Sequence, residues 1–374
     1  MLKSFLLTVM MGPGVPVPVP QPVLDALTGV QVNSGGARGG FQLTFAAGKS
    51  SPLIKTMLPA GYFDPGMRVI IIVTFGGVPN VLMDGIVTRQ ELSPSNDPGK
   101  STFTVTGEDL SVVMDIVEMP FMRYPAMPAP VRVLTILARY AVLGIAPIVI
   151  PPIFLDTPIP INEIPAQTGT DLQYIQELAS QNGHIFFIEP GPAPGANVAY
   201  WGPDFRIPNP QPALNVNMDA ETNVESLSFS LDGMAKKILV FTILDPATGK
   251  APVPIPVPNI SLLRPPMGAR LTPPMKVEFG HDIAKENPVK AIALALARTA
   301  DSSDAISGSG QLDVLRYGRI LKARQLVGVR GAGVAYDGLY HVKSITHNIK
   351  IGEYKQSFNL SRDGLISLTP RVVP

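Results

Sequence analysis

The stretch that decides the fold is YDGLYHVKSITHNIKIGEYKQSFNLSRDGL, residues 336–365. Its alternation of apolar and polar residues predicts two β-strands joined by a short loop. Gly352 lies in that loop, where a hairpin often requires a positive φ. The residues expected to share a face are Tyr340, Val342, Ser344 and Thr346 in the first strand, and Tyr354, Gln356, Phe358 and Leu360 in the second. The segment carries no recognisable chemistry, so we interpret it as the closing hairpin of a structural barrel.

The composition indicates a multidomain protein with large interfaces. At 374 residues, two or three domains are expected. Charged residues make up 16% of the sequence, against a usual share of about 25%, and the mean hydropathy is +0.23. A surface with so few charged residues suggests that much of it is buried against partner proteins. The alternative explanation for this composition is a large core with long apolar loops. The formal net charge of +1 provides no basic field for nucleic acid. The absence of Cys excludes disulfides and thiolate catalysis, and fits a reducing cytoplasm.

Proline is unusually frequent, with 40 residues, and it clusters at 15–22, 145–152, 189–195 and 251–259. Alternating Val and Pro favours an extended or polyproline II backbone, which predicts stiff connectors or arms at 12–22 and 251–259. Ligands of SH3-type domains are an alternative, but no strict PxxP with a flanking Arg stands out. The apolar stretches 1–11 and 141–155 are short and broken by Gly or Pro. We therefore expect a soluble protein without stable membrane insertion.

Hydrophobic periodicity divides the sequence into three regions. Residues 1–118 are predicted to be mostly β, 119–214 mixed α/β with Pro-rich linkers, and 215–374 β again with an inserted helix. The spacing of the strands in the first region suggests a small antiparallel barrel, and duplication of that barrel in the third is a hypothesis. The strands expected are 41–45, 67–75, 81–90, 101–107, 184–188, 224–231, 237–243, 319–323 and 326–330.

Three helices are predicted, at 131–144, 170–182 and 287–300. In the first, Leu134, Leu137 and Tyr140 or Ala141 should share the buried face, with Gly144 just past the end. The second has a capping box of Thr170 and Gln173 and a Gly183 terminator. Its buried stripe is Leu172, Ile175, Leu178 and Ala179. The third begins with Asn287 as N-cap and Pro288 at the first helical position.

Candidate catalytic and metal-binding residues are few. His341 and His347 have a spacing compatible with one face of a strand, but zinc sites usually need three or four ligands. The segment HDIAKEN, with His281, is interpreted as a solvated loop. The glycines of VGVRGAGVAYDG, residues 327–338, do not match the dinucleotide fingerprint and favour a loop with positive φ.

The sequence contains no GxSxG, HExxH or P-loop motif either. Trp201 is interpreted as a packing residue rather than a sugar platform, and His184 begins a predicted strand. The sequence therefore predicts no catalytic residue, no cofactor, no metal and no enzymatic activity.

Three passages resemble one family. They are GIVTR with STFTVTGEDL at 85–89 and 101–110; TDLQYIQELA with GHIFF at 170–179 and 183–187; and YHVKSITH with GEYK and Arg362 at 340–347, 352–355 and 362. In their order and spacing they resemble the late-control-protein-D family of phage tails and the N-terminal hub portion of VgrG-type spike proteins. Both are baseplate hubs of contractile injection machines. The sequence lacks the oligosaccharide-binding domain and β-helical spike of a full VgrG-type protein. We therefore expect a stand-alone hub with a separate spike, closer to extracellular injection systems than to a type VI apparatus.

The resemblance implies a mostly β, α+β protein with two tube-like antiparallel β-barrel domains, at 1–118 and 215–374, around a mixed middle domain at 119–214. It implies a structural homotrimer that adapts a hexameric inner tube to a threefold spike. The implied partners are the inner tube protein, a spike at the distal face and baseplate wedge components. Assembly is expected in the cytoplasm, within a phage-tail-like particle that becomes extracellular on release. The alternatives are the hub of a true contractile-tailed bacteriophage, a β-rich hydrolase and a carbohydrate-binding module.

Overall fold

The computed structural model describes residues 4–36, 38–97, 99–152, 155, 157–161, 164–206, 209–244, 252–257, 266–280, 304–369 and 372. Within them, one sheet contains thirteen strands in the order β12-β17-β20-β19-β3-β4-β7-β6-β5-β1-β2, with β18 beside β19 and β11 beside β18. Its neighbouring strands are antiparallel except for β11 and β18. The bounds are β1 Phe5–Gly12, β2 Val17–Pro18, β3 Leu27–Ser34, β4 Gly40–Ala46, β5 Arg68–Phe75, β6 Val78–Ser93, β7 Thr102–Asp109, β11 Gln211–Asn215, β12 Val224–Leu231, β17 Ile306–Asp313, β18 Leu326–Arg330, β19 Gly338–Lys350 and β20 Glu353–Arg362. The predicted mostly β class is confirmed.

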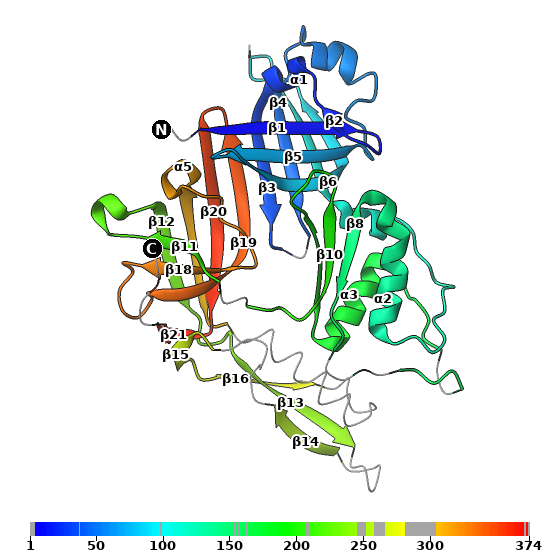
Figure 1. Ribbon diagram of the computed structural model, residues 1–374, viewed down its shortest axis with the longest axis vertical. Helices are drawn as coiled ribbons and strands as arrows, with labels where there is room; N and C mark the ends of the chain where they lie inside the picture. Colours follow the sequence, from blue (N-terminus) through cyan, green and yellow to red (C-terminus); the bar gives the residue numbers. More distant parts are fainter. Residues whose placement is uncertain are drawn as a thin grey trace.

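The two predicted β regions meet edge to edge in this sheet. Strand β3 pairs with β19 in antiparallel register from Ile345 opposite Ser34 to Ile349 opposite Val30. Figure 1 shows the blue strands of the N-terminal part beside the orange-red β19–β20 hairpin. One core cluster of buried side chains continues across the junction, from Val32 and Leu43 to Phe358. The first and last thirds of the protein therefore share one sheet and one hydrophobic core.

A separate α/β unit lies between them in sequence. It combines the sheet β8-β10-β9 with helices α2 and α3, which lie on one side of that sheet in Figure 1. The bounds are β8 Ile145–Val149, β9 Ile185–Pro190, β10 Asn197–Gly202, α2 Ala129–Leu137 and α3 Asp171–Asn182, with 3-10 turns η2 at Leu110–Asp115 and η3 at Ala138–Leu143. A second core cluster fills this unit, and Trp201 is fully buried within it. Trp201 is thus a packing residue, as predicted.

Helix α3 matches its sequence signals. The Thr170 hydroxyl accepts from the Gln173 backbone N–H, and the Gln173 side chain accepts from the Thr170 N–H, which completes the capping box. Gly183 ends the helix in the left-handed conformation. The predicted stripe is buried in full: Leu172, Ile175, Leu178 and Ala179. Both the bounds and the face of this helix are confirmed.

The predicted helix at 131–144 is only partly correct. The backbone is α-helical over Ala129–Leu137 and then tightens into the 3-10 turn η3, which Gly144 ends with a positive φ. The buried face consists of Val133, Ile136 and Leu137, whereas Leu134 is 42% exposed. The assignment of Leu134 to the core was wrong because the buried stripe runs through Val133, Ile136 and Leu137. Tyr140 packs against the same core, as expected.

The terminal hairpin is confirmed in outline and corrected in detail. Residues Lys350 and Glu353 pair across a two-residue turn in which Gly352 has φ +76°. On β20, Tyr354, Gln356, Phe358 and Leu360 are all buried, as predicted. On β19 the register shifts between Val342 and Ser344, and this bulge reverses the faces beyond it. Ile345, His347 and Ile349 point inward instead of the predicted Ser344 and Thr346.

Other predictions in the C-terminal third have mixed outcomes. Strands β12 and β18 match their predicted ranges. Residues 319–323 do not form the predicted strand but a coil after the short helix α5, Val314–Tyr317, because Gly318 ends that helix in a left-handed turn. Strand β17 was not predicted, since its sequence ISGSGQLD contains few apolar residues. The predicted helix 287–300 and the HDIAKEN loop lie outside the described residues.

Two small sheets and short helical turns complete the described part of the protein. One sheet, β14-β13-β16, projects from the lower end of the molecule in Figure 1. The second pairs β15 with β21. The remaining bounds are α1 Gln21–Ala26, η1 Leu53–Met57, β13 Lys237–Leu244, β14 Pro252–Val257, β15 Gly268–Leu271, β16 Lys276–Gly280, η4 Asp219–Glu221 and β21 Gly364–Ser367. Within the Pro-rich segments, residues 252–257 thus form the edge strand β14, and Val17–Pro18 form β2.

Candidate functional site: arginine junctions between the units

Buried arginines join the α/β unit to the large sheet. Arg68 on β5 binds Asp84 on β6 through two hydrogen bonds, from Nε to Oδ1 at 2.8 Å and from Nη2 to Oδ2 at 2.7 Å. Arg68 also donates to the carbonyl of Leu143 at 3.0 Å, and Asn197 on β10 donates to Asp84 at 2.8 Å. Asp84 is 2% exposed. One ion pair across two strands therefore fixes the positions of β10 and the end of η3.

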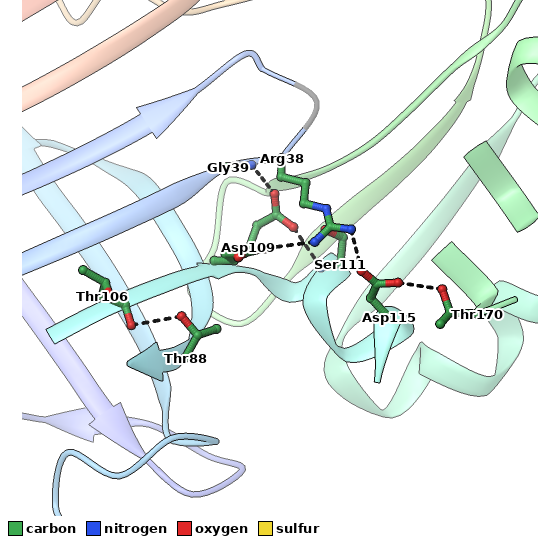
Figure 2. Close-up of polar contacts among 9 residues, drawn as sticks. Arg38, Gly39, Thr88, Thr106, Asp109, Ser111, Asp115 and Thr170 are labelled. Carbon is green, nitrogen blue, oxygen red and sulfur yellow. Dashed lines mark hydrogen bonds and ion pairs between the residues drawn. The ribbon is translucent and has the colours of Figure 1, made fainter. Parts of the chain in front are cut away.

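A second junction lies where β7 enters η2 (Figure 2). The Arg38 guanidinium lies 2.5 Å from an oxygen of Asp115 and 3.3 Å from Glu108. The other oxygen of Asp115 accepts from the Thr170 hydroxyl at 2.6 Å. This hydrogen bond from Thr170, opposed by partial burial and supported by Arg38, lowers the pKa of Asp115. The loop before β4 is thereby linked through η2 to the N-terminus of α3.

Asp109 organises the same corner from inside. Its carboxylate accepts from the backbone N–H of Gly39 and from that of Ser111, so it caps η2 and holds the β3–β4 loop (Figure 2). Burial raises the pKa of Asp109 despite these hydrogen bonds. Thr88 and Thr106, also drawn in Figure 2, make a longer contact of 3.4 Å between β6 and β7. The polar groups of this corner thus bind one another within the protein.

Arg324 connects three parts of the protein. Its Nε lies 2.9 Å from Glu189 on β9, and its other nitrogens donate to the carbonyls of Gly35 and Gly36 at 3.0 and 2.9 Å. The guanidinium also lies 3.8 Å from the centre of the Phe187 ring. Arg324 itself precedes β18, so this one residue touches the β3–β4 loop, the α/β sheet and the C-terminal strands. The planar guanidinium suits this combination of hydrogen bonding and stacking.

Asp304 forms a junction at the start of the C-terminal strands. It lies 2.7 Å from Arg206, accepts from the Ser361 hydroxyl at 2.7 Å, and lies 3.8 Å from Lys343. Burial acts to raise the pKa of Asp304, but Arg206, Ser361 and Lys343 together hold it below the usual value. The link after the α/β unit is thus attached to β20 by a buried charge pair.

Arg362, a residue of the resemblance, supports the hairpin. It is fully buried, donates to the carbonyls of Ala335, Asp337 and Gly364 at 2.7–2.8 Å, and lies 4.4 Å from the centre of the Tyr340 ring. These contacts hold the loop before β19 against the end of β20. Arg362 therefore has a structural explanation in this fold.

The candidate histidines are dispersed. His347 is buried in the large core with Nδ1 2.7 Å from the Tyr354 hydroxyl, and burial lowers its pKa to about 4. The spacing of His341 and His347 is compatible with one face of a regular strand, but the β19 bulge lies between them and places them on different faces. His184 packs 4.4 Å from the Trp201 ring, and burial lowers its pKa to about 4. His281 lies outside the described residues. The structure brings none of the described histidines together.

The described residues contain no group of three His, Cys, Asp or Glu side chains placed to hold a metal ion. None of the helices in that part of the protein is long and apolar enough to span a membrane. The predicted absence of catalysis and cofactors stays a prediction. Sequence reasoning missed the arginine junctions because Arg68, Arg324 and their carboxylates are separated in sequence and follow no motif. The sequence indicated these junctions only indirectly, because it places charged residues within or beside predicted strands of a protein that has few charged residues.

Comparisons with known proteins identify the fold. No family model matches the sequence, and no curated protein matches it. Among solved structures, a tail protein from Neisseria meningitidis MC58 is similar over 97% of this chain and 98% of its own, with a TM-score of 0.65 at 14% identity. The 43 kDa tail protein of prophage MuSo2 from Shewanella oneidensis is similar over 96% and 98%, with a TM-score of 0.59 at 13% identity. In the lidded PdpA–VgrG complex of Francisella, one protein is similar over 99% of this chain and 54% of its own, with a TM-score of 0.60 at 8% identity.

Proposed function

We propose that this protein is the structural central hub of the baseplate of a contractile injection system. The observation that carries the proposal is the likeness to tail proteins over almost the whole of both chains, at TM-scores of 0.59 to 0.65. A likeness over this much of both chains means that the units follow one another in the same order, and that more than one common module is shared. The proposed work of the protein is geometric, with no catalysis. It matches an inner tube on one face to a spike on the other.

In this proposal the hub is a homotrimer. Each protomer supplies two tube-like barrels, from residues 1–118 and 215–374, so three copies present a pseudo-sixfold ring to a hexameric tube. The pairing of β3 with β19 supports this, because it joins two sets of strands into one surface. The middle domain, 119–214, is held to that surface by the Arg68–Asp84 pair, which binds Leu143 and Asn197, and by Arg206 and Arg324. Fixed angles between units are what a ring-building protomer requires.

The proposed partners are the inner tube protein, a spike at the distal face and wedge components of the baseplate. Exposed apolar side chains support extensive contacts: Phe121, Val142 and Ile161 are 92%, 88% and 94% exposed. Side chains of this kind are costly to leave in water and are enriched in the buried centres of interfaces. Assembly would occur in the cytoplasm, and the finished particle would carry the hub outward.

Light scattering on the purified protein tests the trimer. We expect a mass of about three times 39.9 kDa and rings in electron micrographs. A stable monomer at micromolar concentration would contradict the proposal. A variant that lacks residues 336–365 should form no rings, because the shared sheet would lose β19 and β20. Rings formed by that deletion would also count against it.

A second candidate is the tail hub of a true contractile-tailed bacteriophage. The similarity to the tail protein of prophage MuSo2 favours this role, because a prophage is a bacteriophage genome. Antibody labelling of particles from the producing cells separates the two roles. Label on tails attached to DNA-filled heads supports the phage role, and label on headless particles supports the injection system.

A further inference from the structure

A polar pocket at the edge of the C-terminal strands has no role in the contacts described above. Its volume is about 400 Å³, and it lies between the end of β11, the turn η4, the end of β18 and the short helix α5. The lining residues are Asn215, Ala220, Glu221, Thr222, Asn223, Arg316 and Arg330. These residues belong to separate elements, so the concave surface exists only in the folded protein.

The wall of the pocket is a tightly bonded loop. The Asn223 side chain accepts from the Asn215 N–H at 2.8 Å and donates to the Ala213 carbonyl at 2.9 Å. Asn217 has φ +51°, in the left-handed region. Gly331 permits the close approach of this loop to β18, because a Cβ there would collide with the Val216 carbonyl. The pocket therefore has a fixed wall before any ligand binds.

Two arginines line this pocket without a carboxylate partner. In the described part of the protein, neither Arg316 nor Arg330 has a hydrogen bond or an ion pair through its guanidinium. The junction arginines Arg68, Arg206 and Arg324 each have a carboxylate within 3 Å. Two guanidinium groups and the single carboxylate of Glu221 leave the lining with a net positive charge of one. The pocket thus favours a ligand with one negative charge.

One residue of the pocket wall, Asn215, has an amide oxygen without a hydrogen-bond partner. Asn215 is 8% exposed, and its Oδ1 is buried without a hydrogen-bond partner, while its Nδ2 donates to the Glu221 carbonyl at 3.1 Å. A buried amide oxygen without a donor is unfavourable, because it has lost its hydrogen bonds to water and gained none in return. A ligand that supplies an N–H to this oxygen would remove that cost. The site therefore requires two features of its ligand, an anionic group and a nearby N–H donor.

We propose that this pocket binds a peptide carboxylate of another protein, with Arg316 and Arg330 holding the carboxylate and Asn215 Oδ1 accepting an N–H of the same residue. The side chain of an Asp or Glu and the C-terminus of a polypeptide share this chemistry, because each places a carboxylate near a backbone amide. Glu221 disfavours groups with more than one negative charge. This inference goes beyond the proposed hub role and does not depend on it.

Saturation-transfer NMR on small probes tests the site with the full-length protein. N-acetylglycine mimics a C-terminus, and N-acetylaspartate α-amide mimics an acidic side chain. We expect at least one of them to bind, with acetate and N-acetylglycinamide at least tenfold weaker because each lacks one of the two features. The probe that binds more tightly identifies the source of the carboxylate.

Arg316→Gln and Arg330→Gln should each weaken binding at least tenfold, with unchanged thermal midpoints as the check on folding. Arg319→Gln is the matched control, since Arg319 is exposed, lies nearby in sequence and does not line the pocket. Binding that survives both pocket variants would overturn the proposal, as would the absence of binding by either peptide probe. Inorganic phosphate that displaces the probe at equal concentration would also overturn it, because a general anion site needs no N–H donor.

Discussion

At the scale of single residues, the buried ion pair of Arg68 and Asp84 is expected to have a large effect on stability. Arg68→Met removes the cation and leaves Asp84, which is 2% exposed, without its partner. We expect a loss of about 3–5 kcal/mol in the free energy of unfolding, measured by urea denaturation at pH 7. Arg89→Met is the control, because Arg89 and Glu91 are 72% and 56% exposed and their pair should contribute less than about 1 kcal/mol. Equal losses in the two variants would contradict the assignment.

A second prediction at this scale concerns acid sensitivity. The pKa of His347 is about 4 in the folded protein, against 6.5 as the ordinary value, because burial disfavours the charged ring. The unfolded state therefore binds the extra proton between pH 6.5 and 4, and stability falls as the pH is lowered through that window. The contribution is of order 3 kcal/mol across it. His347→Gln keeps a polar side chain beside Tyr354 but cannot titrate.

Urea midpoints at pH 7, 5.5 and 4 provide the measurement for His347→Gln. The variant should lose less stability than the parent protein on acidification. His184 has a similarly lowered pKa and remains in both proteins, so the difference between the two profiles isolates His347. Parallel profiles would mean that the protonation of His347 does not differ between the folded and unfolded states in this window.

For whole elements, helix α3 provides a direct test of the α/β unit. Leu178 is 2% exposed in the core of this unit, so Leu178→Asp places a charge where no partner exists among the described core residues. We expect a loss of at least about 4 kcal/mol, unfolding of the unit and no trimer. Ser180→Asp introduces the same side chain on the exposed face of the helix and should leave both properties intact. Circular dichroism and light scattering measure the outcome; trimers of Leu178→Asp would contradict the expected role of this core.

The elements also show which parts of the fold a sequence can predict. Helix α3 was predictable in bounds and face because its cap, stripe and terminator are all local signals. The faces of β19 were not, because a bulge between Val342 and Ser344 has no sequence marker and reverses every side chain beyond it. Strand β17 escaped prediction because it is held by pairing with β12 and β20 on either side rather than by its own composition. In both strands, pairing with neighbouring strands rather than local sequence determines the structure.

For the whole molecule, Arg324 is the residue that connects most parts. Arg324→Ala removes its contacts with Gly35, Gly36, Phe187 and Glu189. We expect faster amide hydrogen exchange in the β3–β4 loop and in β9, with little change within α3, because the units would separate at this junction without unfolding. Arg319→Ala is the matched control. Mass spectrometry of exchanged peptides provides the measurement, and unchanged exchange in both segments would contradict the junction role.

The arrangement of the units was beyond prediction for a related reason. The sequence indicated β regions in the first and last thirds, but not that β3 would pair with β19. The Arg324 junction depends on that pairing, since Arg324 reaches Gly35 only when the two regions are side by side. Interactions between residues so distant in sequence leave no local pattern for periodicity or motif reasoning to detect.

The pairing of β3 with β19 has a consequence for how this protein is made. A ribosome releases residues 30–34 long before 345–349, and at roughly 5–20 residues per second the interval is tens of seconds. During that time one edge of β3 has no neighbour, and an unpaired edge is a site of aggregation. The nascent N-terminal strands must therefore remain soluble until the hairpin emerges. Translation speed and chaperone supply should govern the yield of folded protein.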